Sequence, residues 1–261
     1  MRFGFAALAV LSVSLFSFAA SAQEGKLTPE QKEEIRGVVR DYLTTDPTVT
    51  KDALSALQQY MEAEASTRLK AVVKENTDAI YNSKLSPVGG NPSGDVTIVE
   101  FFDYNCGYCH MAAALVERLV REDPGVKIIY KQFPILSEDS STAAKVALAV
   151  AKQGKYTEFH AAMMNKKPEE SGSPSDPMAA ATALGLDMEK IKTDSESAEV
   201  KAEIEQNYAL AQKLGIRGTP AYIIGDTLTP GAISYAQMQE LVAAARTKQE
   251  AKEAPAPTKM N

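Results

Sequence analysis

Cysteine and histidine are scarce in this chain of 261 residues, which holds only two of each. Secreted proteins that rely on disulfides for stability usually carry several, so a disulfide scaffold is excluded. A structural zinc site needs about four ligands. Cys106, Cys109, His110 and His160 show no second ligand pair, so we predict no zinc or other dedicated metal site.

Positive charge is also in short supply, with 28 Lys and Arg against 34 Asp and Glu, a net charge of −6. Binding to the phosphate backbone depends on a surplus of positive charge. We therefore expect no nucleic-acid partner. After the first residues, no apolar run is long enough to span a bilayer.

The first 22 residues have the pattern of a secretory signal peptide. Arg2 supplies the positive charge, residues 3–18 are apolar, and residues 20–22 read Ala-Ser-Ala, a typical cleavage site. An uncleaved anchor is the alternative, and the polar residues that follow disfavour it. Export would place the two cysteines in an oxidising compartment.

The two cysteines lie in one stretch, Cys106-Gly107-Tyr108-Cys109. An apolar run leads into it and a helical pattern follows, which is typical of a redox motif. At a helix N-terminus, backbone N–H groups and the helix dipole favour the Cys106 thiolate, which is the attacking species. Cys109 lies one helical turn later and can resolve a mixed disulfide. Binding of soft Cu(I) by both thiolates is an open alternative.

Glu100 interrupts the apolar strand expected at residues 96–102. Burial raises the pKa of a carboxyl group, which suits a proton relay near the cysteines. The alternative is a residue at the strand edge that faces solvent.

Two helices are expected before the redox motif. Thr28, Pro29 and Gln31 form a capping box, and the first helix should end before Asp46-Pro47. A second helix, at about residues 50–82, has a narrow apolar stripe on a polar surface. We predict a homo-oligomer through residues 28–82. The alternative is a monomer in which the helices fold back on the domain.

The rest of the chain reads as a mixed α/β domain. Pro220 directly precedes an apolar strand, where a cis peptide bond is plausible. His160 lies in a helical pattern and is expected to be a packing or surface residue rather than a ligand. The expected elements are a linker at 86–95, strands at 96–102, 126–133 and 221–224, a hairpin turn and short strand at 226–231, a helical block at about 138–214 with a loop at 166–177, a helix at 234–246 and a disordered tail at 247–261.

Three motifs make residues 96–246 resemble the DsbA family of the thioredoxin superfamily. They are Glu100-Phe101-Phe102, the run Lys-Gln-Phe-Pro-Ile-Leu at 131–136, and Gly-Ile-Arg-Gly-Thr-Pro at 215–220. The resemblance implies an α/β protein: a thioredoxin fold with an inserted helical domain, preceded here by an N-terminal α-helical segment. It also implies the bacterial periplasm. The expected organisation is a signal peptide at 1–22, a helical segment at 23–85, the DsbA-like domain at 86–246 and the tail.

The resemblance also implies roles for individual residues. Cys106 becomes the nucleophile and Cys109 the resolving thiol, with Glu100 as the buried carboxylate below them. Pro220 matches the cis-proline that faces the disulfide, and the backbone of Thr219 would pair with a substrate strand. No cofactor is expected beyond the redox-active Cys106–Cys109 disulfide.

Gly107, Tyr108 and Thr219 differ from DsbA, which has Pro-His and Val at these places, and look like the isomerase DsbC. The N-terminal helices look like those of ScsC-like and Com1-like proteins. We therefore expect a periplasmic thiol:disulfide oxidoreductase that leans to isomerase or reductase chemistry. A monomeric DsbA-type oxidase is the alternative, and a non-enzymatic Cu(I) carrier or chaperone is the rival. Expected partners are unfolded or misfolded secreted proteins and a membrane redox protein that recycles the pair.

Overall fold

The computed structural model describes residues 27–165 and 176–253. The predicted signal peptide, most of the predicted loop at 166–177 and the last eight residues of the predicted tail lie outside these ranges. The chain divides into two compact units, Met1–Gln59 and Tyr60–Asn261, and each is described by itself.

The first unit holds helix α1 (Pro29–Thr45) and the start of α2 (Pro47–Glu75). The predicted capping box is present. The Gln31 amide donates to the Thr28 hydroxyl oxygen at 3.2 Å, and the Thr28 amide donates to the Gln31 side chain at 2.9 Å. The break between the helices falls at Asp46, as predicted from the proline that follows.

The predicted apolar stripe is exposed in this unit. No residue of α1 is buried. The residues of this stripe in the first unit recur at helical spacing and are exposed: Ile35, Val38, Val39, Tyr42, Leu43, Leu54 and Leu57.

In the second unit, the last part of α2 packs against the core. Leu69 is buried in the same apolar cluster as Phe101 and Ile223 of the sheet. The helix predicted to run to residue 82 is interrupted at Asn76, whose side-chain amide donates to the Val72 carbonyl oxygen at 2.8 Å. A short helix, α3 (Thr77–Tyr81), follows.

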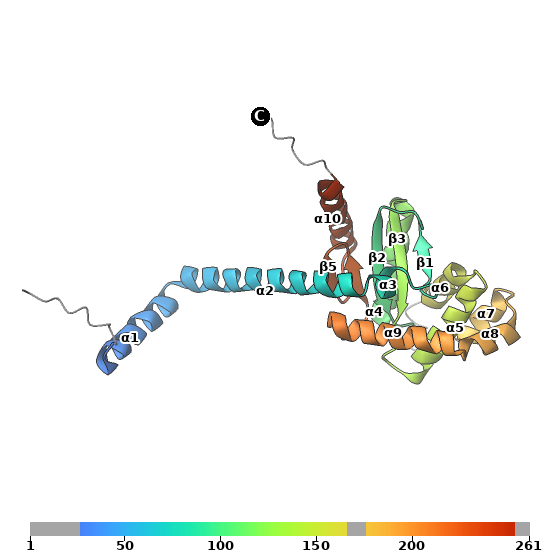
Figure 1. Ribbon diagram of the computed structural model, residues 1–261, viewed down its shortest axis with the longest axis horizontal. Coiled ribbons are helices and arrows are strands. Elements are labelled where there is room, and N and C mark those ends of the chain that lie inside the picture. The colour runs from blue at the N-terminus through green and yellow to red at the C-terminus, as the bar shows by residue number, and fades with distance from the viewer. Residues whose placement is uncertain (1–26, 166–175, 254–261) are drawn as a thin grey trace, which may run out of the picture. The chain divides into compact units, whose positions relative to one another are not determined.

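A five-stranded mixed sheet forms the centre of the second unit, in the order β1-β3-β2-β4-β5 (Figure 1). Strand β2 is parallel to β3, and the other neighbours are antiparallel. The strands are β1 (Val88–Gly90), β2 (Val96–Phe102), β3 (Val126–Gln132), β4 (Ala221–Ile224) and β5 (Thr227–Pro230).

Strand β1 corrects the prediction of a plain linker at residues 86–95. Its composition is that of a turn, and it becomes a strand only through antiparallel pairing with β3. A side chain at Gly89 would lie 2.8 Å from the Tyr130 ring, so glycine permits this close approach.

Helices cover both faces of the sheet. On one face, Val99 and Phe101 pack with residues of α3 and α9 (Ala198–Leu214). On the other face, Ile98 packs with α4 (Gly107–Glu122) and α10 (Tyr235–Glu253). Because β2 is buried on both sides, its apolar residues do not alternate with polar ones, and Thr97 and Glu100 are its only polar members.

Between β3 and β4 the chain forms the predicted helical insertion. Before α9 it contains α5 (Glu138–Lys152), α6 (Tyr156–Met164), α7 (Pro177–Ala183) and α8 (Met188–Ser195). In Figure 1 these four helices gather beside the sheet, while α9 runs back from them crosswise to the strands. Asp187 caps the short helix that was predicted between residues 187 and 197.

The predicted tail begins too early. Helix α10 continues to Glu253, so residues 247–253 are helical and not disordered. This segment is rich in Lys, Glu, Gln and Ala, which are good helix formers that extend a helix already anchored by its buried start. Among the described residues, no helix has the length and apolar character needed to cross a membrane.

Candidate functional site

The two cysteines lie at the start of α4. Cys106 is the N-cap residue, in an extended conformation, and Cys109 lies in the first turn. Both are free thiols and both are buried, with Cys109 fully enclosed. Gly107 and Tyr108, between them, are exposed. The apolar run of β2 therefore ends in a loop that presents one thiol at the helix end and hides the other.

The two thiols have opposite acidities. The pKa of Cys106 is lowered to about 5, first because the Cys109 thiol donates a hydrogen bond to its thiolate, and also because of Thr219 and the amides of Cys109 and Tyr108. The pKa of Cys109 is raised, first by burial and then by its bond to Cys106. Near neutral pH, Cys106 is therefore a thiolate and Cys109 a protonated thiol.

The loop before β4 lies opposite the thiols. The peptide bond between Thr219 and Pro220 is cis. The carbonyl oxygen of Thr219 lies 3.3 Å from the Cys106 sulfur, and Pro220 is buried. Two motifs far apart in the sequence, the CxxC and the Gly-Thr-Pro run, thus meet at one sulfur atom.

Glu100 is buried in the centre of β2, so the alternative of a solvent-facing side chain is wrong. The Tyr222 hydroxyl donates to Glu100 Oε1 at 3.2 Å. Burial raises the pKa of the Glu100 carboxyl to about 7, and the bond from Tyr222 opposes that rise. A carboxyl group that titrates near neutral pH can accept and return a proton. Its charge also contributes to the raised pKa of Cys109.

Asp103 is a site residue that the sequence reasoning missed. Its Oδ1 accepts from the Asn105 amide at 2.8 Å, and its Oδ2 accepts from the Ile135 and Leu136 amides at 2.9 and 3.0 Å. It therefore binds the loop of the CxxC to the loop after β3. Asp103 carries no local signal of this role, although two of its donors, the Ile135 and Leu136 amides, belong to the motif at 131–136.

His110 was also left without a role. Its Nε2 lies 2.7 Å from the Tyr104 carbonyl oxygen, and its Nδ1 lies 3.0 Å from the Met164 carbonyl oxygen. It therefore bridges the loop before Cys106 and the end of α6. This contact fixes the active-site loop to the helical insertion.

Of the two expected places for His160, packing and surface, the structure shows packing. It lies among the rings of Phe102, Tyr104, Tyr130 and Tyr156. Burial first, and then the charge of His110, lower the pKa of His160 to about 3, so it stays neutral at physiological pH.

Comparison with known proteins supports the same reading of the fold. Residues 97–243 match the family model of the DSBA-like thioredoxin domain, which is more than half of the chain. The chain belongs to this family. Residues 31–64 match a second model, the N-terminal domain of the copper resistance protein ScsC. The predicted DsbA-like, ScsC-like character and the thioredoxin fold with inserted helices are confirmed.

Solved structures of the family resemble this chain over most of their length. A thioredoxin-like oxidoreductase from Silicibacter pomeroyi DSS-3 is 47% identical, covering 65% of this chain and 97% of that one, with a TM-score of 0.60. Proteus mirabilis ScsC in a transitional conformation is 31% identical, covering 85% of this chain and 98% of that one, with a TM-score of 0.58.

Curated relatives match over shorter parts. The Na(+)/H(+) antiporter NhaA 3 of Salinispora tropica is 27% identical over 52% of this chain, and the match spans only 21% of that protein. A probable thiol:disulfide interchange protein DsbC of Bordetella avium is 30% identical over 56% of this chain and 42% of its own length. The chain thus spans a fifth to under a half of these two proteins.

Exposed apolar side chains flank the cysteines of this family member. Tyr108 and Met111 of α4 are 64% and 61% exposed, and Leu136 is 54% exposed on the loop that Asp103 holds. We call these three residues the apolar surface. Tyr108 and Met111 follow Cys106 directly in the first turns of α4.

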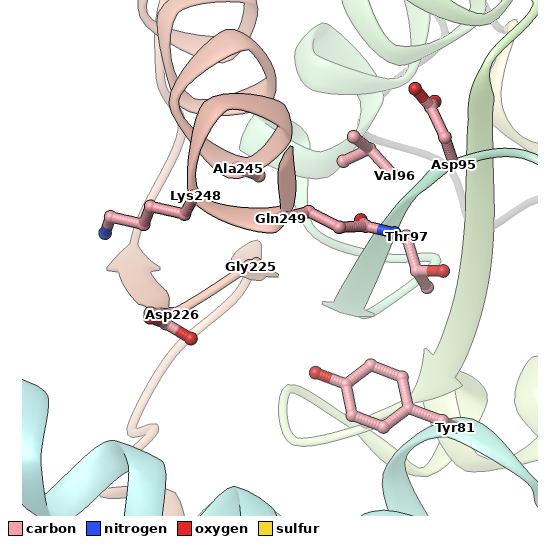
Figure 2. A pocket seen from close by; sticks show the side chains of 9 residues that line it. All are labelled: Tyr81, Asp95, Val96, Thr97, Gly225, Asp226, Ala245, Lys248 and Gln249. Atoms are coloured by element: carbon pink, nitrogen blue, oxygen red, sulfur yellow. The ribbon is translucent and has the colours of Figure 1, made fainter. Parts of the chain in front are cut away.

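The described residues contain no cluster of three or more His, Cys, Asp or Glu side chains placed to hold a metal ion. A pocket of about 300 Å³ lies at the other end of β2, beside Val96 and Thr97 (Figure 2). Its Asp226 pairs with Lys70 at 3.5 Å. Because β2 runs from this pocket toward the cysteines, the pocket is separate from the site.

Proposed function

We propose that the protein is a thiol:disulfide oxidoreductase that exchanges disulfides with secreted proteins and leans to isomerase or reductase chemistry. One observation carries the proposal: Cys106 is the N-cap of α4 with its sulfur 3.3 Å from the Thr219 carbonyl oxygen beside the cis-proline, while Cys109 is fully enclosed. The pKa of Cys106 is accordingly lowered and that of Cys109 raised. This division makes one thiol the nucleophile and keeps the other in reserve.

The reduction of a substrate disulfide then takes two steps. The Cys106 thiolate attacks one sulfur, the substrate S–S bond breaks, and a mixed disulfide forms while a substrate thiolate leaves and takes a proton from water. Cys109 then gives its proton to Glu100 and attacks the Cys106 sulfur. The second substrate thiolate leaves, and the protein holds the Cys106–Cys109 disulfide. Two electrons have passed from the protein to the substrate.

Isomerisation uses the first step and its reversal with a different substrate thiol. It needs a mixed disulfide that lives long enough for the substrate to rearrange. The raised pKa of Cys109 supports this, because a protonated thiol attacks slowly. The exposed Tyr108 and the rest of the apolar surface would hold the misfolded chain, with the Thr219 backbone beside the reacting sulfur.

We infer that the protein works as a homo-oligomer joined through residues 28–82. Two observations support a second copy as the partner of these helices. Their apolar stripe is exposed in the first unit, and residues 31–64 match the ScsC N-terminal domain. Several active sites on one assembly would favour the shuffling of wrong disulfides.

The proposed setting is the periplasm, reached through the signal peptide expected at residues 1–22. An isomerase or reductase there must be kept reduced, because the compartment is oxidising. The recycling partner is therefore a membrane protein that donates electrons to the Cys106–Cys109 disulfide.

Replacement of Cys106 tests the reaction class. Cys106→Ser is expected to abolish both the reduction of insulin and the refolding of scrambled ribonuclease. Cys109→Ser should keep the first attack and accumulate a mixed disulfide that gel electrophoresis without reductant detects. If both activities survive in Cys106→Ser, the protein is not a disulfide exchange enzyme.

The choice between isomerase and oxidase chemistry is tested by comparing the wild-type protein with a variant whose exposed apolar stripe is disrupted. Leu57→Glu is expected to lower the solution mass and to abolish refolding of scrambled ribonuclease while insulin reduction persists. Ser55→Glu adds the same charge at an exposed position off the stripe and should change neither. A wild-type protein that oxidises reduced ribonuclease but leaves the scrambled form unchanged would instead be a DsbA-type oxidase.

A further inference from the structure

Tyr222 lies directly opposite Glu100 in the sheet. The two residues are partners in the antiparallel register of β2 and β4. Tyr222 is fully buried, and its hydroxyl donates to Glu100 Oε1 at 3.2 Å. Among the described residues this is the one hydrogen bond that the Glu100 side chain makes. The carboxylate at the centre of the site thus depends on a single donor.

The charges of the reacting thiols also act on the phenol of Tyr222. Its pKa is raised, first by burial and then by the charges of Glu100 and Cys109, with a smaller effect from Cys106. A phenol with a raised pKa keeps its proton throughout the physiological range. Tyr222 is therefore a permanent donor, and the carboxylate form of Glu100 accepts a stronger hydrogen bond than the neutral acid does.

A second tyrosine provides a natural comparison. Tyr130 of β3 is the partner of Glu100 on the other side, in the parallel register. It is half-buried and its ring packs against Phe102 and His160, but in the described part of the chain no hydrogen bond joins it to Glu100. The two tyrosines differ in the one contact that matters here.

We propose that Tyr222 is a positioning residue of the exchange reaction: it holds the Glu100 carboxylate by a hydrogen bond and so keeps it ready to accept the Cys109 proton at neutral pH. The inference rests on the proposed function, in which Glu100 takes that proton when Cys109 attacks the mixed disulfide. Tyr222 itself neither gains nor loses a proton. Its hydrogen bond stabilises the charged form of Glu100 and partly offsets the free-energy cost of burying that charge.

The expected effect follows from the loss of one charge-assisted hydrogen bond. In Tyr222→Phe the midpoint of the Glu100 titration should rise by on the order of one pH unit. A group with a pKa of about 7 is half ionised at pH 7. A group with a pKa about one unit higher is ionised in roughly one molecule in eleven. Resolution of the mixed disulfide by Cys109 should therefore slow about fivefold at pH 7 and recover almost fully at pH 9.

Two measurements test this in the full-length protein. The first follows the Glu100 carboxyl by NMR of protein labelled at glutamate side chains, over pH 5 to 9, with Glu100→Gln to assign the signal. The second follows the release of a model thiol from the Cys106 mixed disulfide over the same range. Tyr130→Phe is the matched control, because it removes the hydroxyl of a half-buried tyrosine that is paired with Glu100 in the sheet but makes no hydrogen bond to it.

The midpoint of the Glu100 titration should rise in Tyr222→Phe and stay unchanged in Tyr130→Phe. In a Glu100→Gln background, Tyr222→Phe should have no further effect on the pH profile of thiol release. An unchanged midpoint in Tyr222→Phe, or an equal change in both variants, would overturn the inference. The NMR titration does not depend on catalysis. A protein that moves its midpoint but exchanges no disulfides would therefore refute the proposed function and leave the positioning contact in place.

Discussion

The low pKa of Cys106 depends first on Cys109. The largest cause of the shift to about 5 is the hydrogen bond from the Cys109 thiol to the Cys106 thiolate, and the helix end and Thr219 add smaller amounts. Replacing Cys109 by alanine removes that donor without disturbing the N-cap position of Cys106. The pKa of Cys106 should therefore rise in Cys109→Ala.

The size of the rise follows from the strength of one hydrogen bond to a charged group, about 1.5–3 kcal/mol. One pKa unit corresponds to about 1.4 kcal/mol, so the pKa should rise by about one to two units, to about 6–7. At pH 5.5, a pKa of about 5 gives a thiolate in about three molecules of four, whereas a pKa of about 6.5 gives one in about eleven. Cys106 should then react roughly eightfold more slowly at this pH.

Alkylation by iodoacetamide measures this directly. The reduced protein is treated between pH 4 and 9, and mass spectrometry follows the modified Cys106. Cys109→Ser is the matched control, because its hydroxyl can still donate, and its midpoint should lie below that of Cys109→Ala. The reasoning is refuted if Cys109→Ala retains a midpoint near pH 5, since the helix end and Thr219 would then hold the thiolate alone.

Three further predictions concern the support of the site. Burial raises the pKa of Glu100 from about 4.5 in the unfolded chain to about 7 in the folded protein, so its contribution to stability is complete below pH 4.5 and is lost as the pH rises through 7. In urea unfolding, Glu100→Gln should therefore exceed wild type in free energy of unfolding by up to about 3 kcal/mol at pH 8.5 and by little at pH 4.5. An equal gain at both pH values would argue against a buried carboxyl group that titrates. Glu203→Ala leaves the fully buried Lys131 ammonium without its carboxylate and should lower the free energy of unfolding by about 3–5 kcal/mol. The double change Lys131→Met, Glu203→Leu should restore most of that loss. A loss below about 1 kcal/mol in Glu203→Ala would mean that the pair is not buried in solution. Asp103→Ala removes the acceptor of three backbone amides and should speed hydrogen exchange at the Ile135 and Leu136 amides, with Asp103→Asn intermediate; unchanged exchange would contradict the proposed link between the loops.

The parts of the fold that could be predicted are those fixed by neighbours in sequence. The capping box at Thr28 and the apolar run of β2 are local signals, and both elements begin where the sequence indicates. Strand β1 could not be predicted, because its glycines become a strand only by pairing with β3. The continuation of α10 past residue 246 could not be predicted for a related reason. A charged, alanine-containing segment is compatible with a disordered tail or with a helix, and it becomes helical here because it extends a helix whose start is packed in the core.

The residues of the candidate site also fall into those with a local sequence signal and those without one. The cysteines form a motif within four residues, and Glu100 stands out as an acid in an apolar strand. Asp103 and His110 carry no such signal, because their partners lie on other elements: the loop after β3 and the end of α6. A short polar residue in a loop can face solvent or bind backbone amides, and only the approach of a distant loop decides between these.

Lys131 shows what such distant contacts mean for the domain boundary. It is the first residue of the motif at 131–136 and is fully buried, and its ammonium donates to the Ala79 carbonyl and to Ser86 at 2.6 Å. Glu203 of α9 accepts from the same Ser86 at 2.6 Å and from Ser83 at 2.6 Å. The pKa of Lys131 is lowered by burial, and the charge of Glu203 opposes that effect.

One polar cluster thus joins the sheet, the helical insertion and the segment before β1. A truncation at residue 85 would remove Ser83 and the Ala79 carbonyl, and it would also expose the core that Ile80 and Leu69 cover. A buried ammonium that loses partners is costly, so such a protein would be unstable for reasons unrelated to self-association. The oligomer is therefore tested by changing the exposed stripe before residue 60, where the second compact unit begins, and not by removing the whole helical segment.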